Sequence, residues 1–207
     1  MVVEEKRATS GVEIHEPKLT VLVPVVDVTP IELDKPIDHK PENLDTLLEN
    51  KIINMRNVVE QVIWKIQAGI GSRIREYLKE NSFTEFHSPK ILAESTEGGA
   101  EVFKVDYFGR EATLAQSAQF YKQIMVGSLE RVYEIGATYR AEPSATTRHM
   151  TEFTTVDVEM GFINSVEDVM EMVQGLVNSV SENIWKTNKK ELEALKSVPP
   201  VLKDKFH

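Results

Sequence analysis

The segment from residue 140 to 153, RAEPSATTRHMTEF, concentrates charge and one aromatic ring in a single connection. Arg140, Arg148 and His149 can each donate charge-assisted hydrogen bonds to phosphate oxygens. Phe153 offers a flat ring against which a base can stack. The link 141–151 has 11 residues between two predicted strands, where about two to five are usual and longer loops are often functional. The connection is therefore a candidate phosphate- and base-binding loop.

Strand alternation sorts the residues on either side of this loop into two faces. In 131–140 the apolar face carries Tyr133, Ile135, Ala137 and Tyr139, and the other face carries Glu134, Gly136, Thr138 and Arg140. In 152–162 the apolar face carries Val156, Val158, Met160 and Phe162, and the other carries Phe153, Thr155, Asp157, Glu159 and Gly161. If helices cover the apolar faces, the opposite faces line one groove that holds Arg140, Phe153, Asp157 and Glu159. The alternative is a solvent-exposed face with cross-strand ion pairs, which antiparallel sheets commonly have.

The elements that position this groove follow from hydrophobic periodicity. Helical spacing of apolar residues predicts helices over 43–80, 117–130 and 165–197, the last broken near Lys186. A capping box, with Ser165 and an aspartate three residues later, begins the last helix. Alternation predicts a hairpin of 102–108 and 112–116, joined by GRE. Hairpins rather than parallel crossovers favour the α+β class, an antiparallel sheet flanked by helices.

The composition limits the classes of protein to consider. The 207 residues are 41% hydrophobic, carry a net charge of −9 and include no cysteine, which excludes disulfides and cysteine-based metal sites. A general nucleic-acid coat would be basic, although a local basic patch can still contact RNA. No apolar run approaches the roughly 18 residues that span a bilayer, and the acidic N-terminus is unlike a signal peptide. A cytoplasmic protein without membrane contact is expected.

The N-terminal region reads differently from the rest. Residues 11–27 are rich in β-formers, and one or two strands cannot bury a core alone, so this piece should belong to a larger sheet. Residues 28–42 carry three prolines among charges and read as a linker or hinge.

Several stretches together resemble a known family. YRAE, a loop and then RHMTEF resemble motif 2 of class II aminoacyl-tRNA synthetases, in the form of the subgroup that charges aspartate, asparagine and lysine. STEGGAEVF (95–103) is similar to the flipping loop that closes over the amino acid. LAQSAQFYKQ (114–123) resembles the amino-acid pocket of archaeal-type aspartyl enzymes, which usually have proline where Ala118 stands.

Two further stretches extend the resemblance over nearly the whole chain. FTEFHSPKI (83–91) resembles motif 1, whose proline corresponds to Pro89 and whose helix lies at the dimer interface. KRATSGVEIHEPKLTVL (6–22) is similar to the last part of an OB-fold anticodon-binding barrel. The resemblance therefore implies a class II synthetase core preceded by strands of an OB-type barrel.

The resemblance implies an ATP site around the loop. Arg140 would bind the α-phosphate of ATP and the carboxylate of the amino acid. Glu142 would accept the adenine amino group, and Phe153 would stack on the adenine. Arg148 and His149 would contact the outer phosphates. ATP and Mg²⁺ are the implied cofactors.

The resemblance also implies an amino-acid site. Glu97 would pair with the ammonium group, and Gln116 and Gln119 would hydrogen-bond around it. Glu159 would lie near the amino acid or the metal. Spacing alone predicts that Lys122 is an exposed lysine on a helix. The resemblance instead implies that Lys122 binds the side-chain carboxylate of aspartate. A carboxylate pocket needs a fixed cation and an amide pocket does not, which favours aspartate over asparagine.

The implied organisation has three parts: an OB-fold remnant (1–27), a linker (28–42) and a catalytic domain with motifs 1 and 2 (43–207). The implied partners are aspartate, tRNA-Asp, with tRNA-Asn left open, and a second copy that meets motif 1 around Pro89. Motif 3, whose arginine clamps the γ-phosphate, is not found in the sequence.

Three interpretations remain open because motif 3 is missing. A fragment of an aspartate–tRNA ligase is favoured. A truncated paralogue would bind ATP, an amino acid or a partner without charging tRNA. An asparagine synthetase-like relative would use the adenylate for amide synthesis, but the OB-like strands count against it. A purely structural role would leave the four ordered motifs unexplained.

Overall fold

The structure is a computed structural model that describes all residues except 9–10, 34–40, 96–100, 145, 147–148 and 201–207. Internal contacts divide the chain into two units, residues 1–57 and 58–207. Each unit is described by itself. The predicted boundaries of the OB-type remnant, the linker and the catalytic domain stay predictions.

The first unit contains one small hairpin and two short helices. Strands β1 (Val2–Glu4) and β2 (Val12–Ile14) pair antiparallel. Helices α1 (Pro41–Glu49) and α2 (Lys51–Asn54) follow, so the first helix begins inside the predicted linker. The predicted extended run 11–27 forms a strand only in β2. The aliphatic side chains that follow it are 75–92% exposed: Leu19, Val21, Leu22, Val23, Val25, Val26 and Val28.

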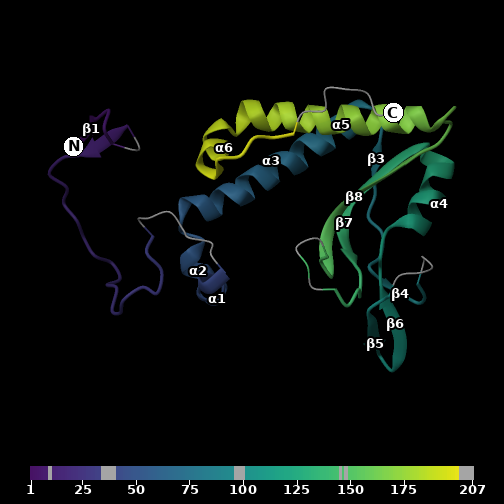
Figure 1. Cartoon of the computed structure of the whole chain (residues 1–207), viewed down its shortest axis with the longest axis horizontal. Helices are drawn as coiled ribbons and strands as arrows, with labels where there is room; N and C mark the ends of the chain where they lie inside the picture. Colours follow the sequence, from purple (N-terminus) through teal and green to yellow (C-terminus); the bar gives the residue numbers. More distant parts are fainter. Residues whose placement is uncertain (9–10, 34–40, 96–100, 145, 147–148, 201–207) are drawn as a thin grey trace. The chain divides into compact units, whose positions relative to one another are not determined.

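The main sheet of the second unit has the order β3–β7–β8 (Figure 1). Strands β7 (Arg131–Tyr139) and β8 (Glu152–Met160) pair antiparallel over their whole length, as predicted. The two-residue strand β3 (Thr84–Glu85) pairs parallel with β7, which the sequence did not reveal. A smaller antiparallel sheet has the order β4 (Ile91–Leu92), β6 (Arg110–Leu114), β5 (Lys104–Tyr107). Its β5–β6 hairpin confirms the predicted one, but the turn is Phe108–Gly109, both with positive φ, and the predicted connection GRE was wrong because Arg110 and Glu111 are already in β6.

Two long helices cover the apolar face of the main sheet. Helices α3 (Val58–Glu80) and α5 (Val166–Thr187) lie side by side in Figure 1 and contact each other. The core between them and the sheet contains Ile74, Leu78, Phe83, Tyr133 and Met172, with Ile135, Val158 and Met160 packed against it. The prediction that helices cover this face is confirmed. Phe162 is an exception: β8 ends at Met160, and Phe162 is 89% exposed with a φ of 55°.

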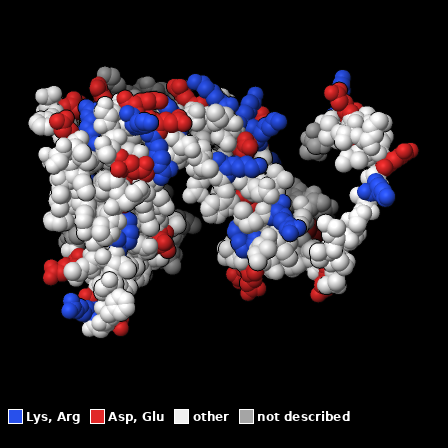
Figure 2. Space-filling view, turned by 180° about the vertical axis from the view of Figure 1, so that it is seen from behind, with Lys and Arg blue, Asp and Glu red and all other residues white. Residues whose placement is uncertain are grey.

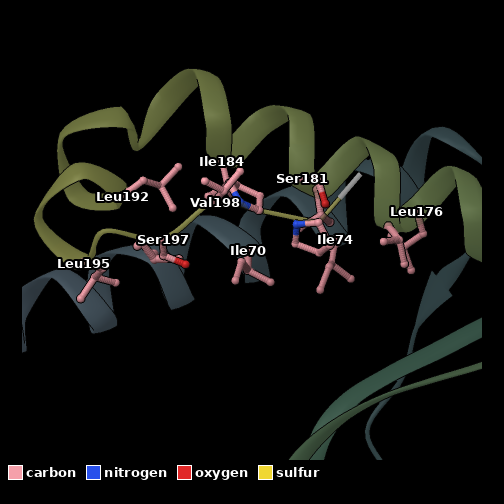
Figure 3. Close-up of a pocket in the computed structure, with 14 residues that line it drawn as sticks. Ile70, Ile74, Leu176, Ser181, Ile184, Leu192, Leu195, Ser197 and Val198 are labelled. Atoms are coloured by element: carbon pink, nitrogen blue, oxygen red, sulfur yellow. The ribbon is translucent and has the colours of Figure 1, made fainter. Parts of the chain in front are cut away.

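The last helices close back on α3. The carboxylate of Asp168 accepts hydrogen bonds from the backbone of Asn164 at 2.7 Å and Ser165 at 3.4 Å, as the capping box predicts. The helical break falls at Asn188, after which α6 (Lys189–Leu195) begins. Figure 3 shows aliphatic side chains of α3, α5 and α6 around an apolar cavity of about 410 Å³. No helix in the described parts of the chain is both long and apolar enough to cross a bilayer.

The polar face of the main sheet is partly covered as well. Helix α4 (Gln119–Leu129) contacts both β7 and β8. Ala118 beside its N-terminus is buried in a cluster with Phe86 and Val132. The interpretation of this face as fully solvent-exposed is therefore wrong for the part under α4. On the face that Figure 2 shows, acidic and basic side chains are interspersed.

Candidate functional site

Arg140 and Phe153 meet where β7 ends and β8 begins. The guanidinium carbon of Arg140 lies 5.6 Å from the centroid of the Phe153 ring, a cation–π contact. The Arg140 backbone N–H donates to the Thr151 carbonyl at 3.0 Å, which carries the strand pairing one step beyond β7. Alternation predicted that these side chains share a face, and the structure brings them together.

The connection after β7 holds a small charged cluster. Glu142 lies between a guanidinium and an imidazole, with carboxylate oxygens 4.0 Å from Arg140 Nη1 and 3.9 Å from His149 Nε2. Thr146 Oγ1 and His149 Nδ1 are 2.6 Å apart, within hydrogen-bond distance. The Arg140 and His149 side chains are nearly half exposed, so an anionic ligand can reach them. Arg148 lies outside the described residues.

Lys122 lies between two carboxylates of β8. Its Nζ is 2.5 Å from Asp157 Oδ1 and 3.3 Å from Glu159 Oε2. The second oxygen of Asp157 accepts the backbone N–H of Ala118 at 3.3 Å, just before α4. Burial alone would lower the Lys122 pKa, but the hydrogen bond and charge of Asp157, with help from Glu159, outweigh it and raise the pKa. The lysine is therefore a fixed cation, contrary to the exposed-lysine reading that spacing alone favours.

This group is unbalanced, with one cation and two carboxylates. Asp157, the closer partner, was placed on the groove face but given no role from sequence. The available signal was its alternation with Glu159, two residues on. Among the described residues, no group of three histidine, aspartate or glutamate side chains is placed to hold a metal ion. Mg²⁺ often binds through one or two carboxylates plus substrate phosphates, and the partly exposed Glu159 is the carboxylate here that could supply one.

Gln116 is buried and joins two segments of the chain. Its Oε1 accepts a hydrogen bond from Ser95 Oγ at 3.1 Å, and its Nε2 donates to the Glu101 carbonyl at 3.5 Å. These partners flank residues 96–100, where the predicted Glu97 lies outside the described residues. Gln119 lies in the first turn of α4, where its backbone N–H donates to Ser117 Oγ at 3.0 Å. The predicted site residues thus form three local groups around the polar face, and their roles stay predictions.

Comparisons with known proteins agree with this architecture. A family model described as tRNA synthetases class II (D, K and N) matches residues 43–206. The aspartate–tRNA(Asp/Asn) ligase of Deinococcus radiodurans is 41% identical over 194 residues, which are 94% of this chain and 44% of that protein. The corresponding ligase of Methanopyrus kandleri is 42% identical over 202 residues, 97% of this chain and 46% of that protein. The chain spans about half the length of the curated relatives it matches.

Solved structures show the same fold. The asparaginyl-tRNA synthetase of Pyrococcus horikoshii, complexed with asparaginyl-adenylate, matches with a TM-score of 0.80 and 30% identity, over 97% of this chain and 46% of that one. The asparaginyl-tRNA synthetase of Entamoeba histolytica, also with asparaginyl-adenylate, matches with a TM-score of 0.71 and 28% identity, over 88% of this chain and 40% of that one. The predicted α+β class is confirmed.

Proposed function

The chain belongs to the class II tRNA synthetases of the aspartate, lysine and asparagine group, and from this premise we propose that it is the ATP- and aspartate-binding part of an aspartate–tRNA ligase. The observation that carries the proposal is the polar face of β7 and β8. There Arg140, a cation for phosphate, and Lys122, a fixed cation for a carboxylate, lie on one side of the same strand pair.

The reaction needs positioned charge and no covalent enzyme intermediate. The α-carboxylate of aspartate attacks the α-phosphorus of ATP in line, a P–O bond forms, and pyrophosphate leaves with its electron pair. Arg140 offsets the negative charge that develops on the phosphorus oxygens. Phe153 stacks on the adenine, Glu142 accepts its amino group, and His149 and Arg148 contact the outer phosphates. A terminal ribose hydroxyl of tRNA then attacks the aspartyl carbonyl and AMP leaves.

Aspartate is distinguished from asparagine by charge. The side-chain carboxylate of the substrate would take the place of Glu159, whose contact with Lys122 is the longer of the two. Glu159 would then be free to turn toward Mg²⁺, which neutralises phosphate charge when bound. An asparagine amide brings no charge and would separate Lys122 from that carboxylate at a cost. Glu97, Gln116 and Gln119 would surround the ammonium group.

The partners in this proposal are aspartate, tRNA-Asp and a second copy of the chain. The Deinococcus relative is named for both tRNA-Asp and tRNA-Asn, whereas that of Thermococcus kodakarensis, 42% identical, is named for tRNA-Asp alone. The similarity therefore supports the ligase class and leaves tRNA-Asn open. We place the dimer contact around Pro89 in motif 1 and the protein in the cytoplasm.

Activation of asparagine is the second candidate, because the two solved structures described above are asparaginyl enzymes. It would leave Lys122 without a carboxylate to bind on the substrate. The same assay separates the two candidates.

The test is amino-acid-dependent ATP–pyrophosphate exchange on the 207-residue chain, with aspartate, asparagine and lysine compared. Exchange with aspartate alone supports the proposal, and exchange with asparagine alone overturns it. If no amino acid supports exchange, calorimetry decides. The chain holds both subsites if it binds ATP and aspartate. Aspartate binding should be lost in Lys122→Gln and kept in Lys104→Gln, an exposed control. Failure to bind ATP, or failure to bind aspartate, would refute the proposal.

A further inference from the structure

Glu134 is a buried carboxylate that the proposed reaction does not use. It lies in the middle of β7, on the same face as Arg140, and is 3% exposed. Its Oε1 accepts the Ser88 backbone N–H at 2.7 Å, and its Oε2 accepts Ser88 Oγ at 2.7 Å and Lys90 Nζ at 2.8 Å. Lys90 Nζ also donates to Ser88 Oγ at 3.0 Å. A buried charge with this many partners is fixed in one position.

The strand leaves room for this carboxylate. Gly136 is the next residue on the same face, and a Cβ atom there would lie 3.3 Å from the Glu134 side chain. Glu134 therefore lies flat along the strand and reaches the Ser88–Lys90 segment. This segment contains Pro89 of motif 1.

The Lys90 backbone is also linked to β7, indirectly, through Ala115. Its carbonyl accepts the Ala115 N–H at 3.0 Å, and the Ala115 carbonyl accepts the Tyr139 N–H at 2.9 Å. A closed ring of interactions results: Glu134 to Lys90, Lys90 to Ala115, Ala115 to Tyr139, and back along β7. Both carbonyl contacts in the ring lie at the junction of the two sheets.

Two candidate site residues are the direct sequence neighbours of residues in this ring. Gln116 follows Ala115, and Arg140 follows Tyr139. The distance between the amino-acid side of the site and its phosphate side is thus set by two backbone hydrogen bonds and one ion pair. Of these three contacts, only the ion pair depends on side chains that mutation can change.

We propose that the Lys90–Glu134 ion pair is a positioning device that holds Gln116 and Arg140 at a fixed spacing, and so aligns the amino acid with the α-phosphate. The alignment role rests on the proposed function. The coupling between the ion pair and the two backbone hydrogen bonds does not.

The coupling is tested by amide hydrogen exchange, followed by NMR on the full chain. Lys90→Met should lower protection of the Ala115 and Tyr139 amides about tenfold more than that of the β7–β8 ladder, because the local junction opens first. Lys90→Arg should restore it. The matched control is Ile74→Val, a core change in α3 that destabilises the unit without touching the ring. A uniform loss of protection in Lys90→Met, like that of the control, would overturn the coupling.

The alignment is tested by calorimetry with ATP, aspartate and the non-hydrolysable analogue aspartyl sulfamoyl-adenosine. The analogue spans both subsites, so a small misplacement should weaken it about tenfold or more. ATP alone and aspartate alone should change several-fold less. Equal weakening of all three ligands, or none, would overturn the positioning role. If the wild-type chain binds none of them, the proposed function and the alignment role both fail, while the exchange experiment still judges the coupling.

Discussion

Two ion-pair clusters on the polar face of β7 and β8 differ in how they are completed. Glu134 has one cationic partner, Lys90, and its carboxylate oxygens accept three hydrogen bonds in a nearly dry environment. Lys122 has two carboxylate partners, Asp157 and Glu159, and the second of these is 30% exposed. The first cluster is balanced around a buried carboxylate, and the second carries an excess negative charge and opens to solvent through Glu159.

The two clusters should therefore have different roles: one stabilises the fold and the other can exchange a partner. Removing one member of a buried, balanced pair leaves an uncompensated charge, which is costly. An unbalanced and partly wet cluster can release one carboxylate and accept another at little cost to the fold. Lys90 and Glu134 should therefore govern stability and alignment, and Lys122 should govern ligand choice.

Replacing each lysine with methionine should have the largest effects on stability, and unequal ones. Lys90→Met should cost roughly 2 to 3 kcal/mol of unfolding free energy, because it strands the Glu134 carboxylate. Lys122→Met should cost about 1 kcal/mol, because the partly exposed Glu159 can turn toward water and Asp157 keeps its hydrogen bond from the Ala118 N–H. Urea unfolding followed by circular dichroism measures both. Equal losses would show that the second cluster is as structural as the first.

The opposite face of β7 offers a third arrangement, between Tyr133 and Glu85. Burial, with a 3.0 Å hydrogen bond to Glu85, raises the pKa of Tyr133 to about 12. The fold thus favours the neutral phenol. Its contribution is full below pH of about 10, the unfolded pKa, and is lost as pH rises toward 12, with a size on the order of 1 to 2 kcal/mol. Thermal melts from pH 9 to 12 should show this loss in the wild type, and Tyr133→Phe should flatten the curve.

In acid, the stability should depend on protonation of Glu134. Burial alone would raise the Glu134 pKa, but its hydrogen bonds from Lys90 and Ser88 outweigh it and lower the pKa. The resulting stability is present above the unfolded pKa and lost as pH falls through the folded value. The difference in stability between wild type and Glu134→Gln should therefore shrink below pH of about 4. Glu80 and Glu167, whose pKa values are also lowered, occur in both proteins and cancel. A difference that is constant with pH would contradict this assignment.

The smallest effect is expected for an exposed pair of the same kind. Lys104 and Glu111 are 3.0 Å apart but 64% exposed on the β5–β6 hairpin. Lys104→Met should change the unfolding free energy by less than about 0.5 kcal/mol, because water screens the charges. A larger change, measured by the same urea titration, would mean that distance rather than burial decides the strength of these pairs.

Local periodicity was enough to predict much of this fold. Alternation placed Arg140 and Phe153 on one face, and the three- and four-residue spacing in 59–78 predicted α3. It was not enough for contacts between distant segments. Glu134 meets Ser88 across 46 residues and Lys122 meets Asp157 across 35, and these pairings depend on how α4 and β3 dock. The two-residue strand β3 is too short to show any period.

The exposed aliphatic run of the first unit affects how the protein behaves in storage. Leu19 to Val23 and Val25 to Val28 are two short stretches of β-forming residues that Pro24 separates. Stacked strands from many molecules need an unbroken series of backbone N–H donors, and proline has none. We therefore expect Pro24 and Asp27 to disfavour fibril formation. Replacing Pro24 with valine would join the two stretches and shorten the lag before a concentrated solution begins to bind thioflavin.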